Sequence, residues 1–283
     1  MAEDQKIIRL YHYMPAKYAE EFLRKDEIKL CDLTKSNDLC EFSPRIVINS
    51  AMAANITNRE LIVANQSESI VNSFRGKCPA IVLSFSTRIS SSAVWGHYAD
   101  KNEGVCLVFD LPICDIEKHK GVMIGNLKGS SETLFQRVHY TGKRFELDAT
   151  ECVNLDESVY HDLCAATSYK SEDWKYEKEC RLVFYQTKES KSLCAKNGMF
   201  FAKGLRQYLS GIVLGPKCPL SNIYFKAIAQ EIKEEDNFNE VYEKLIVFGG
   251  VERARLDEVE LRIKSNHYSD TDFDEMINYQ NKE

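Results

Sequence analysis

Two glutamates, Glu177 and Glu179, precede Arg181 and an apolar run that ends at Tyr185. If the segment from Trp174 to Tyr185 is one strand, its side chains alternate between two faces, so both carboxylates and the guanidinium project from the same face. Neighbouring carboxylates repel each other, and this can raise the pKa of one of them. Such a pair suits general-base work or the stabilisation of an oxocarbenium-like cation. The alternative is an exposed strand face on which Arg181 only neutralises the glutamates.

Hydroxyl side chains gather at the end of a predicted apolar strand, Ala80 to Ser86. Ser84, Ser86 and Thr87 stand where this strand leaves the sheet. Hydroxyls in that place can hydrogen-bond a catalytic carboxylate or a substrate. The alternative is an ordinary turn, which Ser and Thr also favour.

Aromatic and imidazole side chains form two further groups. Trp95, His97 and Tyr98 lie within four residues, and we expect them at a crossing between strands, where their rings could stack on a flat heterocycle. Tight packing in the core is the alternative. His12 lies between two tyrosines on the first predicted strand and points to the opposite face from both.

The composition excludes several classes of protein. The chain has 283 residues, 44% of them hydrophobic and 28% charged, which is ordinary for a globular protein. Its ten cysteines form no C-x-x-C pair and its six histidines show no metal-ligand spacing, so we expect no metal site. Rossmann, P-loop and α/β-hydrolase motifs are also missing. No run of 18 apolar residues occurs, and the start of the chain is polar, which predicts no membrane partner and a cytoplasmic location.

The charge is uneven along the chain. A net charge of −6 argues against non-specific binding to duplex nucleic acid. From Lys170 to Arg206, however, nine Lys and Arg face five Asp and Glu, a local balance of +4. This stretch predicts either a patch that faces phosphate or a solvated charged surface.

The order of predicted elements indicates one α+β domain over residues 1–264, with mixed, mainly antiparallel central sheets and flanking helices. A first strand at Ile7 to Tyr13 leads into a helix that ends near Lys25. A capping box predicts a helix from Thr57 to about Phe74. Alternation predicts a closing strand from Glu258 to Lys264, with Val259, Leu261 and Ile263 inward, and residues 265–283 form a polar, loosely held tail.

Several of these segments together resemble a bacterial family of unknown function, number 2971, over about Leu10 to Gly215. The segments that carry the resemblance are Leu10 to Tyr13, Asn37 and Asp38 with Glu41 and Phe42, Trp95 to Tyr98 followed by Gly104, and the block Trp174, Tyr176, Glu177, Glu179, Arg181. The last block, W-x-Y-E-x-E-x-R, is the most specific of them.

The same arrangement is similar to the ADP-ribosyltransferase superfamily. Its members carry a His or Arg on the first strand, a Ser-Thr-Ser-type turn on a central strand and an E-x-E acid on a later one. The corresponding residues here are His12, then Ser84 and Ser86, then Glu177 and Glu179. The turn reads Ser-Phe-Ser-Thr, and His replaces the Arg that E-x-E enzymes usually carry, so the His-Tyr-Glu and Arg-Ser-Glu subclasses both stay open.

This resemblance implies an ADP-ribosyltransferase-like fold and an enzyme that cleaves the nicotinamide glycosidic bond of NAD. ADP-ribose would pass to water or to a nucleic-acid or protein acceptor, as in a toxin or phage-defence effector. Glu179 would stabilise the ribosyl cation and Glu177 would orient or deprotonate the acceptor. The expected NAD contacts are His12, Ser84, Ser86, Trp95, His97, Tyr98 and Arg181. A catalytically silent recognition or sensor module, and a metal-dependent nuclease built on Glu177, Glu179 and His97, are the alternatives.

Overall fold

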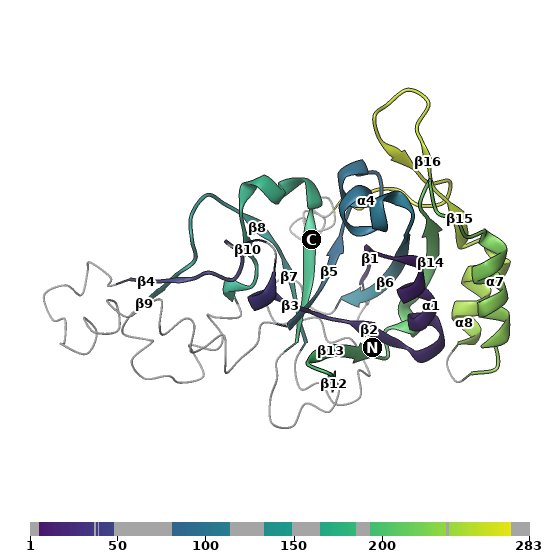
Figure 1. Cartoon of the computed structure of the whole chain (residues 1–283), viewed down its shortest axis with the longest axis horizontal. Helices are drawn as coiled ribbons and strands as arrows, with labels where there is room; N and C mark the ends of the chain where they lie inside the picture. The colour runs from purple at the N-terminus through teal and green to yellow at the C-terminus, as the bar shows by residue number, and fades with distance from the viewer. Residues whose placement is uncertain are drawn as a thin grey trace, which may run out of the picture.

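The computed structural model describes residues 6–36, 38, 40–47, 81–113, 133–148, 165–184, 193–235 and 238–272. At its centre lies an eight-stranded sheet with the strand order β15-β14-β6-β1-β5-β11-β7, and β3 pairs with β5 beside this path (Figure 1). All pairs in this sheet are antiparallel except β14 with β15. Helices flank the sheet, so the predicted α+β class with mixed, mainly antiparallel sheets is confirmed.

The central strands are β1 (Lys6–Met14), β3 (Cys31–Asp32), β5 (Ile81–Ser86), β6 (Val105–Ile113), β7 (Thr133–Arg137), β11 (Glu179–Phe184), β14 (Leu209–Leu214) and β15 (Val251–Arg253). The smaller sheets contain β2 (Glu27–Lys29), β12 (Leu193–Lys196) and β13 (Met199–Lys203); β4 (Arg45–Val47) and β9 (Glu146–Asp148); β8 (His139–Tyr140) and β10 (Tyr169–Lys170); and β16 (Arg255–Leu256) and β17 (Ile263–Lys264). The helices are α1 (Ala16–Lys25), α4 (Ser92–Tyr98), α7 (Asn222–Glu231) and α8 (Asn239–Tyr242).

Alternation along β1 divides the core between the two faces of the sheet. Ile8 and Leu10 point to the face that α1, α7 and α8 cover, where they join a large apolar cluster that includes Phe22. Tyr11 and Tyr13 point to the other face and pack with Trp95 of α4. Successive side chains of a strand face opposite ways, so one strand supplies both cores.

Helix α1 follows directly from its local sequence. Pro15 has the fixed φ that suits a helix start, and an apolar stripe of Ala19, Phe22 and Leu23 is buried on one side. The helix ends where Asp26 takes a left-handed conformation with φ of 50°. Both the first strand and this helix are confirmed as predicted.

The central sheet opens between β1 and β5. Strand β1 pairs with β6 at nine positions, from Lys6 to Met14, but pairs with β5 only at Tyr11 and Ser86. The next pair, β5 with β11, is again continuous from Ile81 to Ser86. Strands β1 and β5 therefore diverge on both sides of one point of contact, which leaves room for a pocket.

The predicted closing strand, Glu258 to Lys264, is wrong. Val259 and Leu261 are 91% and 103% exposed, and only Ile263 is buried. Asp257 accepts hydrogen bonds from the backbone N–H groups of Val259 and Glu260, which turns the chain into the tip of the β16–β17 hairpin. An Asp that bonds to backbone two residues ahead favours a turn over an extended strand.

The polar tail is not loosely held over its first part. The Tyr268 hydroxyl donates to the Ser210 carbonyl at 3.1 Å, and Asp270 accepts from the backbone N–H groups of Ile89 and Ser90 at 2.9 Å. The Thr271 hydroxyl donates to the Arg9 carbonyl at 2.8 Å. Hydrogen bonds thus fix this segment, and the Tyr268 ring also packs against the apolar cluster of Tyr11 and Tyr13.

The predicted helix from Thr57 to Phe74 and the residues beyond Asp272 lie outside the described residues. Among the helices that the structure describes, none combines the length and apolar character needed to cross a bilayer.

Candidate functional site

A pocket of about 160 Å³ lies where β1 and β5 diverge, and we call it the central pocket. Seven of the nine predicted site residues line it, namely His12, Ser84, Ser86, Tyr98, Glu177, Glu179 and Arg181. Trp95 and His97 are not among its lining residues.

Three neighbouring strands carry the polar walls of the central pocket. His12 lies on β1, Ser84 and Ser86 on β5, and Glu179 on β11, and Ser86 is the register partner of both Tyr11 and Glu179. The His12 Nδ1 atom is 2.7 Å from the Ser84 carbonyl oxygen, so the imidazole bridges the gap between β1 and β5. Burial lowers the pKa of His12, which keeps the ring neutral at neutral pH.

Glu177 does not belong to the strand that carries Glu179. Residues Glu172–Glu177 form a 3₁₀-helix, η5, that Ser171 caps by accepting a hydrogen bond from the Asp173 N–H. Lys178 then takes a left-handed conformation with φ of 47°, and β11 begins at Glu179. The predicted single strand is wrong because a capped helical turn and a left-handed residue precede β11. The expected alternation holds only for Glu179 and Arg181.

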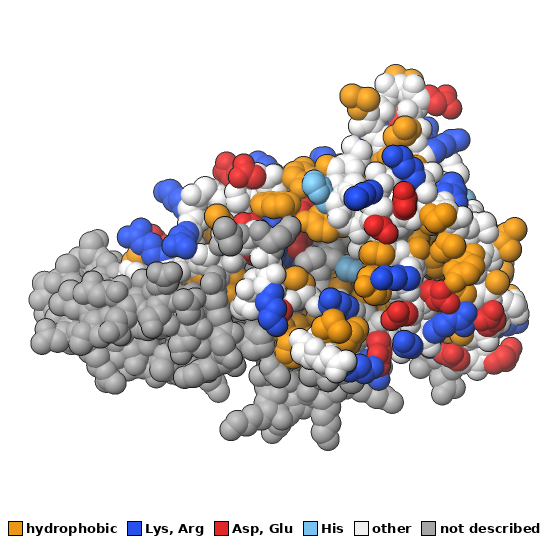
Figure 2. Space-filling view, viewed as in Figure 1, with side chains coloured by type: hydrophobic (Ala, Val, Ile, Leu, Met, Phe, Trp, Pro, Cys, Tyr) orange, Lys and Arg blue, Asp and Glu red, His pale blue; other side chains and the backbone are white. Residues whose placement is uncertain are grey.

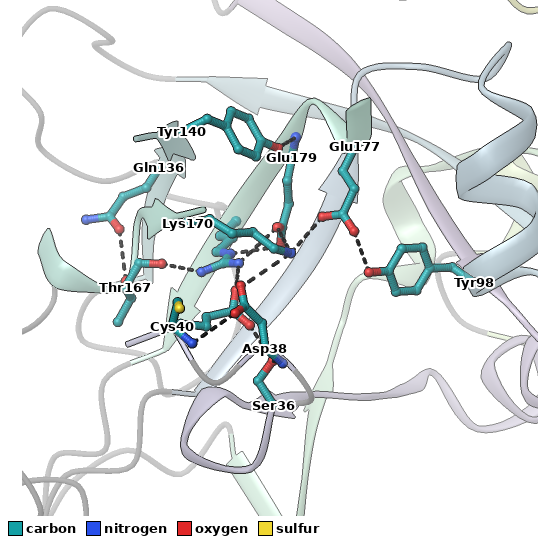
Figure 3. Close-up of polar contacts among 12 residues, drawn as sticks. Ser36, Asp38, Cys40, Tyr98, Gln136, Tyr140, Thr167, Lys170, Glu177 and Glu179 are labelled. Atoms are coloured by element: carbon teal, nitrogen blue, oxygen red, sulfur yellow. Dashed lines mark hydrogen bonds and ion pairs between the residues drawn. The ribbon is translucent and has the colours of Figure 1, made fainter. Parts of the chain in front are cut away.

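The two carboxylates nevertheless meet at one ammonium group. Lys170 Nζ is 2.6 Å from Glu177 Oε2 and 3.0 Å from Glu179 Oε2 (Figure 3). All three side chains are buried. The helical turn brings Glu177 back over the start of β11, and Lys170 on the short strand β10 neutralises both acids from one side.

Arg181 forms a bidentate pair with the carboxylate of Glu179. Its Nε and Nη2 atoms donate to the two carboxylate oxygens of Glu179 at 2.8 and 2.9 Å, and Nη2 also bonds to Glu41. Arg181 is only 1% exposed. The alternative of an exposed, alternately charged strand face is therefore wrong, because these charges are buried and held in place by bidentate hydrogen bonds.

The cluster shifts the pKa values of Glu177 and Glu179 in opposite directions. Three buried carboxylates, those of Glu41, Glu177 and Glu179, face two buried cations. Burial raises the pKa of Glu177, against the opposing effect of Lys170. Burial also opposes the ionisation of Glu179, but Arg181 and Lys170 outweigh it and lower that pKa to about 2. Carboxylates whose pKa values are driven apart are candidates for different roles in acid–base chemistry.

Two hydroxyl groups position Glu177. Tyr98 of α4 donates from its hydroxyl to Glu177 Oε1 at 2.5 Å, and Ser86 donates to the Glu177 backbone carbonyl at 2.6 Å. Burial and the bond to Glu177 raise the pKa of Tyr98, so its hydroxyl stays a donor. The helix α4 thus delivers a phenol, and β5 a serine, to the same glutamate.

Trp95 and His97, which were expected at the site, do not line the central pocket. The Trp95 indole is fully buried, donates to the Ile89 carbonyl at 2.8 Å and packs edge-on against Tyr13, with ring centroids 5.0 Å apart. His97 lies next to the rings of Tyr98 and Tyr176. The expected crossing between strands is in fact the helix α4, from which Tyr98 lines the pocket whereas Trp95 is buried in the core.

Three further residues belong to this site and were not predicted from the sequence. Glu41 and Lys170 line the central pocket, and the Tyr140 hydroxyl accepts a hydrogen bond from the Glu179 backbone N–H at 2.7 Å. Glu41 had a signal, since it belongs to one of the segments that carry the family resemblance. Lys170 had none, because its short strand shows no pattern that marks a buried cation.

The described residues offer little for metal chemistry. Within those ranges, no group of three or more His, Cys, Asp or Glu side chains is arranged to hold a metal ion. Lys170 and Arg181 already occupy the carboxylates of the predicted nuclease pair, and His97 lies outside the pocket. The pocket's own groups instead suit stabilisation of positive charge and transfer of one proton.

The site therefore belongs to an α+β protein whose sheet opens on a buried glutamate, lysine and arginine cluster. Residues 94–182 match the model of a family described as a protein of unknown function, DUF2971. This match begins in α4, ends in β11 and includes Tyr98, Lys170, Glu177 and Glu179, whereas Glu41 of the cluster lies outside it. Comparisons with curated proteins and with solved structures gave no match.

Proposed function

We propose that the central pocket cleaves the bond between nicotinamide and ribose in NAD and transfers ADP-ribose to an acceptor or to water. One observation carries this proposal. The elements expected from the resemblance to ADP-ribosyltransferases, His12, the serines of β5 and Glu179, lie on three neighbouring strands and line one pocket. They are far apart in the sequence, so their meeting is not a consequence of local pattern.

The charges of the pocket fit the electronic demand of this reaction. When the glycosidic bond breaks, its electron pair leaves with nicotinamide and positive charge develops on the ribose. Glu179 is ionised at neutral pH because its pKa is lowered to about 2. A fixed carboxylate beside the developing cation stabilises the transition state more than the ground state.

Glu177 suits the second half of the reaction. The acceptor forms a bond to the anomeric carbon and must lose a proton, which a nearby base can take. Glu177 has a raised pKa and contacts Tyr98 and Lys170, which hold its two oxygens in place. A base with a pKa shifted towards neutral pH transfers protons more effectively than an ordinary carboxylate.

His12 and Tyr98 are suited to holding the dinucleotide. With Nδ1–H donating to the Ser84 carbonyl, the neutral His12 ring has Nε2 as an acceptor for a ribose hydroxyl. Tyr98 is 39% exposed and lines the pocket, so its ring is available to contact nicotinamide. A cavity of about 160 Å³ takes only part of NAD, so the adenylate portion would extend beyond its mouth.

A second candidate is a catalytically silent recognition or sensor module of a defence locus. The observation in its favour is that Arg181 engages both carboxylate oxygens of Glu179 and Lys170 engages one of them. A carboxylate held in this way has less capacity to bind a ribose hydroxyl. A silent module would bind NAD or a protein without releasing nicotinamide.

The proposal is tested by incubating the protein with NAD labelled in its adenylate portion and separating the products. Free nicotinamide with labelled ADP-ribose indicates glycohydrolase activity, and label attached to a macromolecule from cell extract indicates transfer. NAD that stays intact in every condition, including extract from infected cells, would favour the silent module.

A further inference from the structure

A second pocket of about 120 Å³ lies next to the central pocket, and we call it the β8–β10 pocket. Its lining includes Thr141, Lys143, Arg144, Phe145, Tyr169 and Lys170. Lys170 lines both pockets, and its Nζ atom bonds to Glu177 in the central one. The two pockets are therefore neighbours on either side of one lysine.

The fold holds two cations at the β8–β10 pocket. Strand β10 runs parallel to β8, and the Thr141 N–H continues this pairing by donating to the Lys170 carbonyl at 3.0 Å. The chain then turns, with the Lys143 N–H donating to the Thr141 hydroxyl at 3.1 Å. Arg144 donates to the Ser43 hydroxyl. Lys143 and Arg144 are thus placed beside β10 by a short, hydrogen-bonded loop.

These two cations have no carboxylate partner within 4 Å among the residues that the structure describes. Both side chains are exposed, and Figure 2 shows Lys and Arg side chains gathered around the loop between β8 and β9. Many other cations of this protein are paired, such as Lys196 and Lys203, which both bind Glu27. Exposed cations at a pocket favour an anionic ligand.

Aromatic rings stand beside the cations. The rings of Phe145 and Tyr169 have centroids 4.9 Å apart at 58°, and His139 lies 5.6 Å from Tyr169. Phe145 and Tyr169 are half-buried and keep part of their surface open. A cationic groove with partly open aromatic rings is the arrangement that binds the phosphates and bases of single-stranded nucleic acid.

We propose that the β8–β10 pocket binds a phosphate and the adjoining base of a single-stranded nucleic acid, which serves as the acceptor of ADP-ribose. This acceptor role rests on the proposed function. His12 and Ser84 mark the NAD side of the central pocket on β1 and β5, whereas β8 lies beyond β11, where the Val138 N–H bonds to the Glu179 carbonyl. A nucleic-acid strand bound in the β8–β10 pocket would thus approach Glu177 from the side opposite to NAD.

The test is binding of a short fluorescein-labelled oligothymidylate, and of the matching oligouridylate, measured by anisotropy over a series of NaCl concentrations without NAD. The double variant Lys143→Gln and Arg144→Gln removes two phosphate contacts and should weaken binding about tenfold. The slope of log K against log[NaCl] should become shallower by about 1.4, which is about 0.7 for each contact. The double variant Lys29→Gln and Lys217→Gln, which removes two exposed cations elsewhere, is the matched control and should bind as the wild type does.

Three results would overturn the proposal. The first is that the wild type binds neither oligonucleotide, and the second is that both double variants lose the same affinity. The third is that the Lys143 and Arg144 variant keeps oligonucleotide binding but loses NAD binding in a parallel titration, which would assign the pocket to the pyrophosphate of NAD. Since binding is measured without NAD, a wild type that binds the oligonucleotide but leaves NAD intact would defeat only the proposed function.

Discussion

Glu177 and Glu179 share the ammonium group of Lys170, yet their surroundings shift their pKa values in opposite directions. Burial raises the pKa of Glu177, whereas Arg181 and Lys170 overcome burial at Glu179 and lower its pKa to about 2. The difference arises because Arg181 contacts only the second of these two acids. Glu179 is therefore a permanent negative charge at neutral pH, and Glu177 is the carboxylate that can exchange a proton.

Replacing Glu177 with Gln should impair transfer to the acceptor more than NAD hydrolysis. The amide cannot take a proton, and loss of a general base typically costs roughly 10² to 10⁴ in rate. The fold should be preserved within about 1 kcal/mol, because a raised pKa means that the charged form of Glu177 does not stabilise the native state. Transfer and hydrolysis would be measured side by side on the same preparation. Equal losses in both would remove the distinction drawn between the two acids.

Replacing Glu179 with Gln should remove activity and also destabilise the protein. The lowered pKa shows that the charge of Glu179 stabilises the folded state, so its loss should reduce the free energy of unfolding by about 3 kcal/mol at neutral pH. Urea titration would measure this change. Glu27→Gln removes a carboxylate that is paired with two exposed lysines, Lys196 and Lys203, and should cost less than about 1 kcal/mol. Similar losses of unfolding free energy in the two variants would contradict the stabilising role of the buried Glu179 charge.

The stability difference between the wild type and Glu179→Gln should depend on pH. The folded-state pKa of Glu179 is about 2 and its ordinary value is 4.5, so its contribution is complete above about pH 5 and is lost as the pH falls from 4.5 towards 2. Urea titrations at several pH values would follow the difference. A gap between the two proteins that stays constant down to pH 2 would show that Glu179 is not ionised by its neighbours.

The Tyr98 hydroxyl should influence the pKa of Glu177. Its hydrogen bond lowers the pKa of Glu177, so Tyr98→Phe should raise this pKa further and move the acidic limb of the pH profile for transfer to higher pH. Tyr224→Phe is the matched control, because it removes a Tyr–Glu bond of 2.5 Å on the surface. A rate loss in Tyr98→Phe with an unshifted profile would limit Tyr98 to packing.

Unrestrained expression of the wild type should arrest growth of a bacterial host, and expression of Glu179→Gln should not. An enzyme that drains NAD or modifies nucleic acid harms its own cell, and the variant lacks the charge that supports cleavage. Colony counts after induction, at equal amounts of soluble protein, would compare the two. Equal arrest by both proteins would separate toxicity from the carboxylate cluster.

Local pattern was sufficient to predict the elements that carry the pocket walls. The strand through His12, the helix after Pro15 and the strand that ends at Ser86 all follow from alternation, an apolar stripe or a turn within a few residues. The position of Glu177 did not follow, because the capped turn that starts at Ser171 and the left-handed Lys178 interrupt a segment whose residue types also suit a strand.

The other contacts of the site could not be predicted because they join residues that are distant in the sequence. Arg181 and Glu41 are 140 residues apart, and no local pattern could pair them. The +4 balance from Lys170 to Arg206 left a phosphate-facing patch and a solvated surface as alternatives, and its described cations are spread over different parts of the fold, while Lys188 and Lys191 lie outside the described residues. Lys170 and Arg181 are buried in the cluster, and Lys196 and Lys203 bind Glu27 on another sheet. The exposed cations of the β8–β10 pocket, Lys143 and Arg144, belong instead to the loop between β8 and β9.

Release of nicotinamide from NAD by the folded wild-type protein is the most direct test of the central claim. Nicotinamide would be quantified by chromatography, with wild type and Glu179→Gln compared at a pH near 7, where both are folded, and with circular dichroism as the check on folding. We predict continuous release by the wild type and a loss of at least about 10² in the variant. No release by the wild type, or equal release by the two folded proteins, would contradict the assignment of this pocket to NAD cleavage.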